Sequence, residues 1–457
     1  MIVLGLGSNV GDRLAHLRTA LQKLKQLPDL TLLQVSPVYQ SDALLPENAP
    51  EDWNHPYLNL AIRAETSLTP DALLPELKKI EWSIGRKPEV RHWGPRVMDI
   101  DILAFDDQVI HTDALTVPHA SLFERPFALW PLADVWPDWV CPLPGAHQGK
   151  TAAELVHPFG SRYEANAPFH TYQLAQRIDA PAIVGILNIT PDSFSDGGLF
   201  LNADSAINQA AQLVLEGAEV IDIGAESTAP GRSLLNEAEE WERLAPVLSA
   251  LMEEKNQWFL APKISVDTRH ARTAERALAL GVDWVNDQSA LADPAMLSLL
   301  AKTQNDIVVM HHLSLPASPE HLLPPHENAV AVVNEWAEAK ISFLEKHGID
   351  KKRIILDPGI GFGKHPHQSL ALIQHAELLK PLGTRLLIGH SRKSFMNTLS
   401  PYPANQRDLE TAAMAPLLSA KGVDFLRVHQ ADATARFLRI TAALSPSRLR
   451  PSQTTQK

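Results

Sequence analysis

The sequence predicts two domains, an N-terminal α+β domain and a C-terminal (β/α)8 TIM barrel. Three observations support this prediction. The chain has 457 residues, which is more than one compact domain usually contains. Over residues 1–145, strand-like and helix-like segments are mixed without strict alternation, as is typical of α+β folds. From Ala182 onward, short apolar strands alternate strictly with longer helical segments, which is the pattern of a parallel barrel.

The N-terminal domain, residues 1–145, is predicted to be a ferredoxin-like sandwich with a mixed, mainly antiparallel sheet. Short apolar runs mark its strands. A Thr-Pro-Asp sequence at residues 69–71 marks the start of its second helix, because threonine is a good N-cap and proline suits the first turn. The expected strands are Ile2–Leu6, Leu30–Tyr39, Tyr57–Ala64 and Val97–Phe105, and the expected helices are Asp12–Leu27 and Thr69–Gly85.

Residues 146–179 are expected to form a tail and linker, because this stretch is rich in proline and glycine and has no clear hydrophobic period. The last residues, 446–457, are polar and are expected to form a disordered tail. The barrel domain is therefore assigned to residues 180–445.

The barrel prediction depends on a count of eight strand-like segments. Eight strand–helix units over about 260 residues match the usual size of a TIM barrel. A doubly wound open sheet is the alternative. The expected strands are Ile183–Asn188, Val220–Gly224, Lys263–Asp267, Trp284–Asp287, Ile307–His311, Ile354–Asp357, Arg385–Gly389 and Phe425–His429.

Polar or charged residues stand at the C-terminal ends of all eight expected strands. Functional side chains of a barrel gather at this rim, and eight such strand ends would be unusual for purely structural turns. The residues are Asn188, Asp222, Glu226, Asp267, Asn286, Asp287, His311, Asp357, Ser391–Lys393, Arg427 and His429.

Composition excludes some classes of function. The formal net charge of −12 argues against a general nucleic-acid binder, although local basic clusters can still bind small anions. Cys141 is the single cysteine, so no intrachain disulfide can form, which fits a reducing compartment. No apolar run approaches the ~18 residues of a membrane span, and the first residues lack the basic start of a signal peptide. We expect a cytoplasmic protein that binds neither nucleic acid nor membranes.

Two aspartates in the N-terminal domain are candidates for metal binding. Asp99 and Asp101 share one face of a strand because side chains alternate with period two. Two such carboxylates can bracket a magnesium ion that also binds phosphate oxygens. A half-exposed strand with polar residues outward is the alternative. The basic residues near this strand favour a polyphosphate site, and they are Arg86, Arg91, His92, Arg96, His119 and Arg125.

Residues 1–145 resemble 6-hydroxymethyl-7,8-dihydropterin pyrophosphokinase. The motifs that carry the resemblance are Gly7-Ser8-Asn9, Tyr57-Leu58-Asn59, Trp93-Gly94-Pro95-Arg96, Asp99-Ile100-Asp101 and Thr116-Val117-Pro118-His119. The resemblance implies that a diphosphoryl group passes from ATP to the hydroxymethyl oxygen of the pterin, with AMP as the second product. Such a reaction depends mostly on positioning and charge neutralisation.

The same resemblance assigns roles to residues of the first domain. Asp99 and Asp101 would hold Mg²⁺ on ATP. Arg86 and Arg96 would close over the phosphates, and His119 and Arg125 would lie near the nucleotide. Asn59 would hydrogen-bond the pterin, and Tyr57 and Phe127 would sandwich its ring. Ordinary core packing is the alternative for these two aromatic residues.

The barrel has a candidate anion site after its seventh expected strand. Gly389-His390-Ser391-Arg392-Lys393-Ser394 places basic residues where a helix begins, and free N–H groups there favour anions. Arg427 and His429 lie at the C-terminal end of the eighth expected strand, and barrels often bind phosphate near strands seven and eight. Asp267 and Asp357 can accept from the donor edge of a heterocycle, while Asn286 can both donate and accept.

Residues 180–445 resemble dihydropteroate synthase. The motifs that carry this resemblance are residues 185–198 (GILNITPDSFSDGG), 222–228 (DIGAEST), 265–268 (SVDT), 286–287 (ND), 356–359 (LDPG), 361–364 (GFGK), 391–394 (SRKS) and 427–429 (RVH). The resemblance implies that the diphosphate leaves the pterin CH₂ group and that the amine of 4-aminobenzoate attacks that carbon. It also suggests association as a homodimer through the barrel.

Roles in the barrel follow from the second resemblance. Asp267, Asn286, Asp357 and Lys393 would hold the pterin. Asn188 would bind Mg²⁺ on the diphosphate, Arg427 and His429 would hold the diphosphate, and Thr228 would contact the substrate. Phe362 and Ser391 would border the 4-aminobenzoate site. These assignments name the residues Thr228, Asp267, Asn286, Asp357, Lys393, Arg427, His429, Phe362, Ser391 and Asn188.

The sequence departs from the second family at two places. The family's Ser-Thr-Arg-Pro-Gly loop has Ala229 where the arginine usually stands, and Arg232 is either its substitute or a surface residue. The fifth strand ends in His311-His312-Leu313, where the family usually has a Met-Gln pair after the histidine. The loop at residues 312–325 is also divergent, so the details of loop closure are in question.

Three hypotheses for the function remain. The first is a bifunctional transferase of folate biosynthesis that acts on ATP, 6-hydroxymethyl-7,8-dihydropterin and 4-aminobenzoate with Mg²⁺. The second makes the barrel a pterin-dependent methyltransferase, which would require a corrinoid partner. The third is an active pyrophosphokinase fused to a catalytically silent, pterin-binding barrel. The Ser391-Arg392-Lys393 turn, the long first loop of the barrel and fusion to a domain that makes a pterin diphosphate argue against the second hypothesis. The presence of Asp267, Lys393 and Arg427 argues against the third, so the first is favoured.

Overall fold

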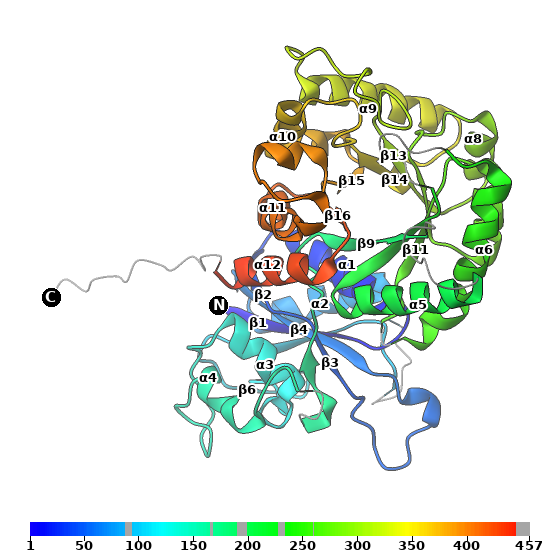
Figure 1. Ribbon diagram of the computed structural model, residues 1–457. Coiled ribbons are helices and arrows are strands. Elements are labelled where there is room, and N and C mark those ends of the chain that lie inside the picture. Colours follow the sequence, from blue (N-terminus) through cyan, green and yellow to red (C-terminus); the bar gives the residue numbers. More distant parts are fainter. Residues whose placement is uncertain (87–93, 165–167, 190–198, 227–233, 259, 445–457) are drawn as a thin grey trace. The chain divides into compact units, whose positions relative to one another are not determined.

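The computed structural model describes residues 1–86, 94–164, 168–189, 199–226, 234–258 and 260–444 (Figure 1). Contacts divide the chain into two compact units, residues 1–179 with 444–457, and residues 180–443. Within the described ranges, no helix is both long and apolar enough to cross a membrane.

The first unit has a six-stranded sheet in which β1 lies between β5 and β4, β4 pairs with both β3 and β2, and β8 pairs with β3. All these pairings are antiparallel, which confirms the predicted α+β fold. The strands are β1 (Ile2–Ser8), β2 (Leu30–Val35), β3 (Tyr39–Ser41), β4 (Tyr57–Thr66), β5 (Asp99–Phe105) and β8 (Tyr172–Gln173), and β6 (Ile110–His111) pairs separately with β7 (Thr116–Val117).

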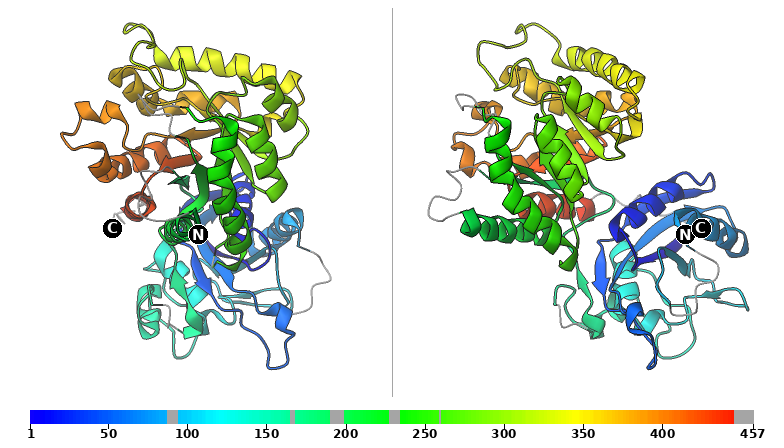
Figure 2. Two further views of the ribbon diagram at one scale, coloured as in Figure 1. Left: turned by 45° about the vertical axis from the view of Figure 1, so that its right-hand side comes forward. Right: turned by 90° about the vertical axis from the view of Figure 1, so that its right-hand side faces the viewer.

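Helices cover both faces of this sheet (Figure 2). The helix α3 packs over the face that carries Val3, Ala61 and Leu103. The helix α2 begins as predicted, because the Thr69 side chain accepts a hydrogen bond from the backbone of Ala72. The helices of this unit are α1 (Arg13–Lys25), α2 (Pro70–Ile84), α3 (Pro126–Val135) and α4 (Ala152–Leu155).

One expected strand, Leu30–Tyr39, is divided in the structure into β2 and β3. The interruption lies at Ser36 and Pro37. The Ser36 hydroxyl donates to the Pro37 carbonyl oxygen and accepts from the backbone N–H of Ala61. Because proline has no backbone N–H, the ladder cannot continue through Pro37, and the chain resumes pairing at Tyr39.

The stretch 146–179, expected to be a linker, contributes regular structure to the first unit. The strand β8 pairs with β3, where Gln173 lies opposite Tyr39. Near its end, the Arg18 guanidinium donates to the carbonyl oxygens of Arg177 (2.9 Å) and Ile178 (3.1 Å). The proline and glycine content of this stretch predicted a linker, but the structure shows that part of it is paired with the sheet.

A buried hydroxyl helps to fix this segment. The Tyr39 hydroxyl donates to Asp134 Oδ2 over 2.5 Å, and Arg162, from the expected linker, pairs with the other oxygen of Asp134. Burial raises the pKa of Tyr39 above its usual value, so the hydroxyl keeps its proton.

We expect Tyr39→Phe to lower the free energy of unfolding by about 1.5–3 kcal/mol, because it removes a hydrogen bond to a charged group. Urea denaturation of the full chain would measure this loss in the transition in which the first unit unfolds. Tyr163→Phe is the matched control, because the Tyr163 side chain is exposed. Equal stability of the two variants would contradict the prediction.

The second unit is a closed barrel of eight parallel strands, as predicted (Figure 1). Its strands are β9 (Ala182–Asn188), β10 (Ala218–Gly224), β11 (Lys263–Asp267), β12 (Trp284–Asp287), β13 (Asp306–Met310), β14 (Ile354–Asp357), β15 (Arg385–Ile388) and β16 (Phe425–Val428). The helices are α5 (Leu199–Leu215), α6 (Glu237–Glu254), α7 (Ala271–Leu280), α8 (Pro294–Leu300), α9 (Ala329–Lys346), α10 (Pro366–Gln374), α11 (Asp408–Ala420) and α12 (Ala431–Leu444).

The interior of the barrel is filled by apolar side chains. Trp284 from β12 and Phe425 from β16 meet edge to face, with ring centroids 4.8 Å apart. The other members of this cluster are Val184, Val220, Val308, Ile355 and Leu387. Because this packed layer closes the interior, the polar residues that follow the strands are left at the C-terminal rim.

Two candidate active sites

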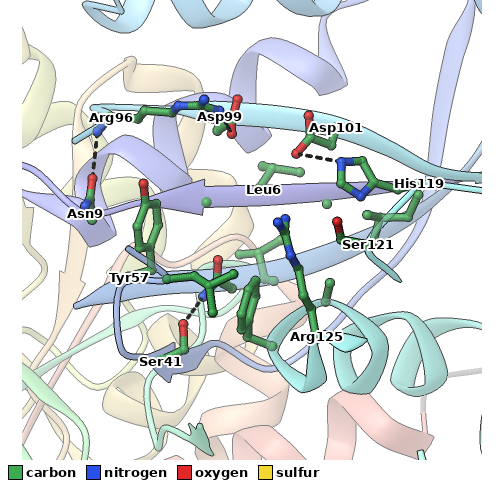
Figure 3. Close-up of a pocket in the computed structure, with 18 of the residues that line it drawn as sticks. Leu6, Asn9, Ser41, Tyr57, Arg96, Asp99, Asp101, His119, Ser121 and Arg125 are labelled. Carbon is green, nitrogen blue, oxygen red and sulfur yellow. Dashed lines mark hydrogen bonds and ion pairs between the residues drawn. The ribbon is translucent and has the colours of Figure 1, made fainter. Parts of the chain in front are cut away.

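The first site is a pocket of about 350 Å³ on the sheet of the first unit (Figure 3). Gly7 of the central strand β1 lies opposite Asn59 of β4 on one side and Asp99 of β5 on the other. A Cβ at Gly7 would lie 3.2 Å from Asn59 Oδ1, so glycine keeps the floor open. The sheet register thus brings together residues that are far apart in the sequence.

Asp99 is held by two of the predicted basic residues. Arg86 Nη1 lies 2.6 Å from Asp99 Oδ1, and Arg96 pairs with Asp99 Oδ2. Although burial opposes it, the charges of Arg96 and Arg86 lower the pKa of Asp99. Arg86 also pairs at 2.6 Å with Glu81, a fully buried carboxylate of α2 that accepts from the backbone of Ile100.

Asp101 lies beside Asp99 but has a different environment. Its Oδ2 is 4.0 Å from His119 Nε2. Loss of hydration in the pocket, followed by the nearby charge of Asp99, raises the pKa of Asp101 to about 7. Burial and the charge of Arg125 lower the pKa of His119, which weakens its ability to balance Asp101. The charges of Lys78 and Arg96 oppose this rise in the pKa of Asp101 without cancelling it.

This donor set fits a magnesium ion that arrives with phosphate. Two carboxylates are the hard oxygen ligands that Mg²⁺ prefers, and substrate phosphates and waters commonly complete its shell. Among the described residues, no group of three or more His, Cys, Asp or Glu side chains could hold a metal alone. Asp99 and Asp101 would therefore provide two of several ligands.

The other end of the first pocket combines aromatic and amide groups. Asn59 Nδ2 donates to Ser41 Oγ over 3.0 Å, which orients the amide. Tyr57 and Phe127 both line the pocket, as the pterin assignment expects. The Arg125 guanidinium lies 5.9 Å from the centroid of the Phe127 ring. Arg91 and His92, the remaining basic residues of this prediction, lie outside the described residues.

The second site is a pocket of about 540 Å³ at the C-terminal rim of the barrel. Every barrel residue assigned from the sequence lines this pocket except Thr228, which lies outside the described residues, as do Ala229 and Arg232. The lining residues among the predictions are Asn188, Asp267, Asn286, Asp357, Phe362, Ser391, Lys393, Arg427 and His429.

A network of charges centred on Arg427 spans three strands of the barrel. Arg427 Nε donates to Asp222 Oδ2 over 2.6 Å, and Nη2 donates to Asp267 Oδ2 over 2.9 Å. Asn286 also donates to Asp222, and Gln288 donates to both oxygens of Asp267. The two carboxylates raise the pKa of Arg427 against the effect of burial. Burial and the charge of Asp222 raise the pKa of Asp267 to about 8.

Lys393 and Asp357 form a second charged group in the barrel pocket. Lys393 Nζ donates to the Ile360 carbonyl oxygen over 2.6 Å and lies 4.5 Å from the centroid of the Phe362 ring. Burial lowers the pKa of Lys393 to about 8, although the charge of Asp357 opposes this. Burial likewise raises the pKa of Asp357, whose Oδ1 accepts from the backbone of Gly359.

His429 and Ser391 approach one another at the rim after strands β15 and β16. Ser391 Oγ lies 2.9 Å from His429 Nδ1. Burial, and then the charges of Arg392 and Arg427, lower the pKa of His429 to about 3, so its ring is neutral at physiological pH. Asn188 ends β9 as an exposed residue. A single amide oxygen is a weak metal site, so an ion at Asn188 would have to arrive with a diphosphate.

The divergent fifth strand end is well packed. Lys364 Nζ lies 2.7 Å from His311 Nδ1 and donates to the carbonyl oxygens of His311 and Phe362. A Cβ at Gly359, whose φ is +65°, would lie 1.8 Å from the His311 carbonyl oxygen, so this position requires glycine. Ala317, from the divergent loop, lines the barrel pocket.

Several site residues were not assigned a role from the sequence. Asp222 was noted only as a strand-end residue, Gln288 follows β12 by one position, and Ser41 ends β3. Functional residues of a barrel lie at the C-terminal ends of its strands, and this rule pointed to Asn286 and Asp287. The same rule could have pointed to the next residue, Gln288. No sequence signal pointed to Glu81, because a glutamate within an amphipathic helix is usually solvated.

Comparisons with known proteins agree with this geometry. Residues 3–137 match the family model described as "7,8-dihydro-6-hydroxymethylpterin-pyrophosphokinase (HPPK)", and residues 184–429 match that described as "Pterin binding enzyme". The "Folate synthesis bifunctional protein" of Chlamydia trachomatis is 38% identical over 96% of this chain and 97% of its own length. The chain belongs to the family of bifunctional folate synthesis proteins. A mitochondrial member from Arabidopsis thaliana is 34% identical over 94% of this chain and 80% of its own length.

Solved structures similar to this folate synthesis protein match its barrel. Dihydropteroate synthase from Anaplasma phagocytophilum, with bound 6-hydroxymethylpterin-monophosphate, is 39% identical, with a TM-score of 0.53 over 58% of this chain and 100% of its own. The Xanthomonas albilineans enzyme with 4-aminobenzoic acid is 35% identical, with a TM-score of 0.53 over 59% of this chain and 95% of its own. Both family domains are transferases, so this chain is a transferase with two catalytic units.

Proposed function

We propose that the chain catalyses two consecutive steps of folate synthesis on one pterin. The first unit transfers a diphosphoryl group from ATP to 6-hydroxymethyl-7,8-dihydropterin and releases AMP. The barrel then joins the pterin diphosphate to 4-aminobenzoate, which yields 7,8-dihydropteroate and diphosphate. The observation that carries the proposal is that each unit has its own polar pocket, built from the motifs of the family that matches it.

In the first site, the chain's own residues would bind and orient the two substrates. Asn59 would hydrogen-bond the pterin, with Tyr57 and Phe127 against its ring. Magnesium bound to Asp99 and Asp101 would neutralise phosphate charge. Arg86 and Arg96 now hold Asp99, and Arg96 also lines the pocket. Both would exchange part of the contact with Asp99 for phosphate oxygens. His119 and Arg125 would contact the nucleotide phosphates.

In the barrel, the reaction breaks the bond between the pterin CH₂ carbon and the diphosphate oxygen. The amine nitrogen of 4-aminobenzoate forms a new bond to that carbon and then releases a proton to water. Asp267, Asn286, Asp357 and Lys393 would hold the pterin, and Thr228 would contact the substrate. Arg427 and His429 would bind the departing diphosphate, since donors aimed at developing charge stabilise the transition state. Phe362 and Ser391 would border the aminobenzoate.

The direct test is to incubate the protein with ATP, Mg²⁺, 6-hydroxymethyl-7,8-dihydropterin and 4-aminobenzoate, and to measure AMP and dihydropteroate separately. We expect both products. AMP and pterin diphosphate without dihydropteroate would favour the silent-barrel alternative. Absence of both products from folded protein with intact substrates would refute the proposal.

The lowered pKa of Lys393 predicts an alkaline limit for the barrel reaction. Lys393 is protonated below its pKa of about 8 and neutral above it. We expect kcat/KM for pterin diphosphate to fall as the pH rises through this value, because a neutral amine is a weaker donor. Lys393→Arg should move the falling limb to higher pH, since arginine stays charged. A profile that remains flat past pH ~9 would contradict the prediction.

We further propose that two copies associate through the barrel and that the protein acts in the cytoplasm. Exposed apolar side chains on α11 and α12 support the first point, and they are Leu409, Leu417, Phe437 and Ile440. Large apolar side chains exposed on a surface are a common feature of interfaces when they lie together. Sedimentation of the intact protein would give its mass in solution, and a monomer at micromolar concentration would contradict association.

A further inference from the structure

The segment Pro168–Gln173, here called the bracing segment, lies against the wall of the first pocket. It consists of a 3₁₀ turn (Pro168–His170) followed, after Thr171, by β8. The strand β8 pairs with β3, which in turn pairs with β4, where Ser41 lies opposite Tyr57. The bracing segment is therefore joined by strand pairing to residues that line the pocket.

The aromatic ring of Phe169 contacts the ring of Phe127. The two rings meet edge to face, with centroids 6.5 Å apart and an interplanar angle of 76°. Phe127 lines the first pocket, where it was assigned to stack on the pterin. The Arg125 guanidinium also approaches the Phe127 ring. Because Phe169 is still 42% exposed, this contact is not explained by burial in a core.

A second contact ties the same segment to the pocket. The backbone N–H of Asp42, which lines the pocket, donates to the Phe169 carbonyl oxygen over 3.1 Å. His170 Nδ1 lies 2.6 Å from Asp42 Oδ2, but both side chains are exposed, so this pair contributes little. Thr171, the next residue, is fully buried and fixes the backbone after the turn.

The backbone of the bracing segment is in an unfavourable conformation. Phe169 has a φ of +59° and His170 a φ of +42°, although neither residue is glycine. Left-handed conformations of such residues are uncommon and persist where the surroundings enforce them. Here the conformation turns the Phe169 carbonyl toward Asp42 while its ring contacts Phe127. The strained turn thus serves two contacts with the pocket wall.

We propose that Phe169 is a positioning residue of the first active site. Its ring fixes the Phe127 ring in the orientation that stacks on the pterin, so it sets the affinity for the pterin and not for ATP. The inference rests on the proposed pyrophosphokinase function of this unit. It assigns part of the pterin site to a segment that the sequence alone marked as a linker.

The test compares Phe169→Ala with the wild-type full chain. Pterin affinity is measured by the fluorescence of 6-hydroxymethylpterin in the presence of Mg²⁺ and a non-hydrolysable ATP analogue, and the affinity for the analogue alone is measured by calorimetry. We expect Phe169→Ala to weaken pterin binding about three- to tenfold, the value of one aromatic pair. Analogue affinity and Tm should stay close to those of the wild type. In turnover, KM for the pterin should rise while KM for ATP does not.

Two further variants separate positioning from general damage. Phe169→Tyr retains the ring and should bind the pterin as the wild type does, whereas Tyr163→Ala removes an exposed aromatic side chain of the same stretch and should have no effect. Unchanged pterin affinity in Phe169→Ala, an equal loss of analogue affinity, or an equal loss in Phe169→Tyr would overturn the inference. Failure of the wild type to bind the pterin would instead refute the proposed function and, with it, this inference.

Discussion

Asp101→Asn is expected to reduce AMP formation by at least about two orders of magnitude, the usual cost of removing one group that stabilises transition-state charge. His119, whose own pKa is lowered, lies 4.0 Å from Asp101, and the charges of Lys78 and Arg96 only partly offset the rise in the pKa of Asp101. This carboxylate can therefore accept a magnesium ion that arrives with ATP. Asparagine keeps the shape and one oxygen but loses the charge. A coupled assay for AMP at saturating Mg²⁺ would measure the loss.

The same substitution should not destabilise the first unit. The folded-state pKa of Asp101 is about 7, above the usual value of 3.8 for an aspartate, so the folded chain binds this proton more tightly than the unfolded chain. The stability that Asp101 contributes is present below pH 3.8 and is lost as the pH rises through 7. At pH 8, Asp101→Asn should therefore be at least as stable as the wild type. This separates loss of function from loss of structure.

Two controls accompany this prediction. Asp107→Asn removes an exposed carboxylate just after β5 and should leave AMP formation unchanged. The barrel of the Asp101→Asn protein, supplied with pterin diphosphate prepared separately, should form dihydropteroate at the wild-type rate. AMP formation within threefold of the wild type would show that Asp101 is not part of the catalytic site.

Arg427→Met should have the largest effect on the barrel. It removes a cation proposed to bind the departing diphosphate, and we expect dihydropteroate formation to fall about 10²–10³-fold. It also leaves the buried carboxylates of Asp222 and Asp267 without their shared partner. Breaking a buried ion pair in this way typically costs about 3–5 kcal/mol.

Because the variant loses stability as well as function, a second substitution is needed. Arg427→Lys keeps the charge and should restore most of the stability, but it cannot reach both carboxylates and an anion in the planar geometry of arginine. We expect its rate to stay at least tenfold below that of the wild type. AMP formation by the first unit of the same molecules is the internal control. Wild-type dihydropteroate synthesis by Arg427→Lys would contradict the proposed role of the guanidinium.

The barrel could be predicted in detail because its signals are local. The strands β11, β12 and β14 have the bounds that the sequence pattern predicts. The C-terminal ends of these strands meet at one rim because of the geometry of the barrel. The sequence therefore predicts that Asp267, Asn286 and Asp357 lie together, and all three line the barrel pocket. Their hydrogen-bond partners were harder to find, since the pairing of Arg427 with Asp222 joins residues 205 positions apart.

The first unit shows where sequence patterns are insufficient. Asp99 and Asp101 were found because strand alternation places them on one face. Gly7 lies between Asn59 and Asp99 at the bottom of the pocket because the strands are ordered β5-β1-β4. No local sequence pattern specifies this strand order. The strand β8 was not predicted because a strand of two residues gives no periodic signal in the sequence. It forms because it pairs with the edge of β3, and not because its residues have a strong intrinsic preference for strands.

The contacts between Arg18 and the carbonyl groups of Arg177 and Ile178 affect how the chain can be dissected. Only residues 179–181 separate Ile178 from the start of β9, a connection of at most about 14 Å when fully extended. A protease has little free backbone to cut there. A truncation at residue 145 would remove β8 and expose the edge of β3 to aggregation. Separate expression of the two halves should therefore divide the chain at 179–181.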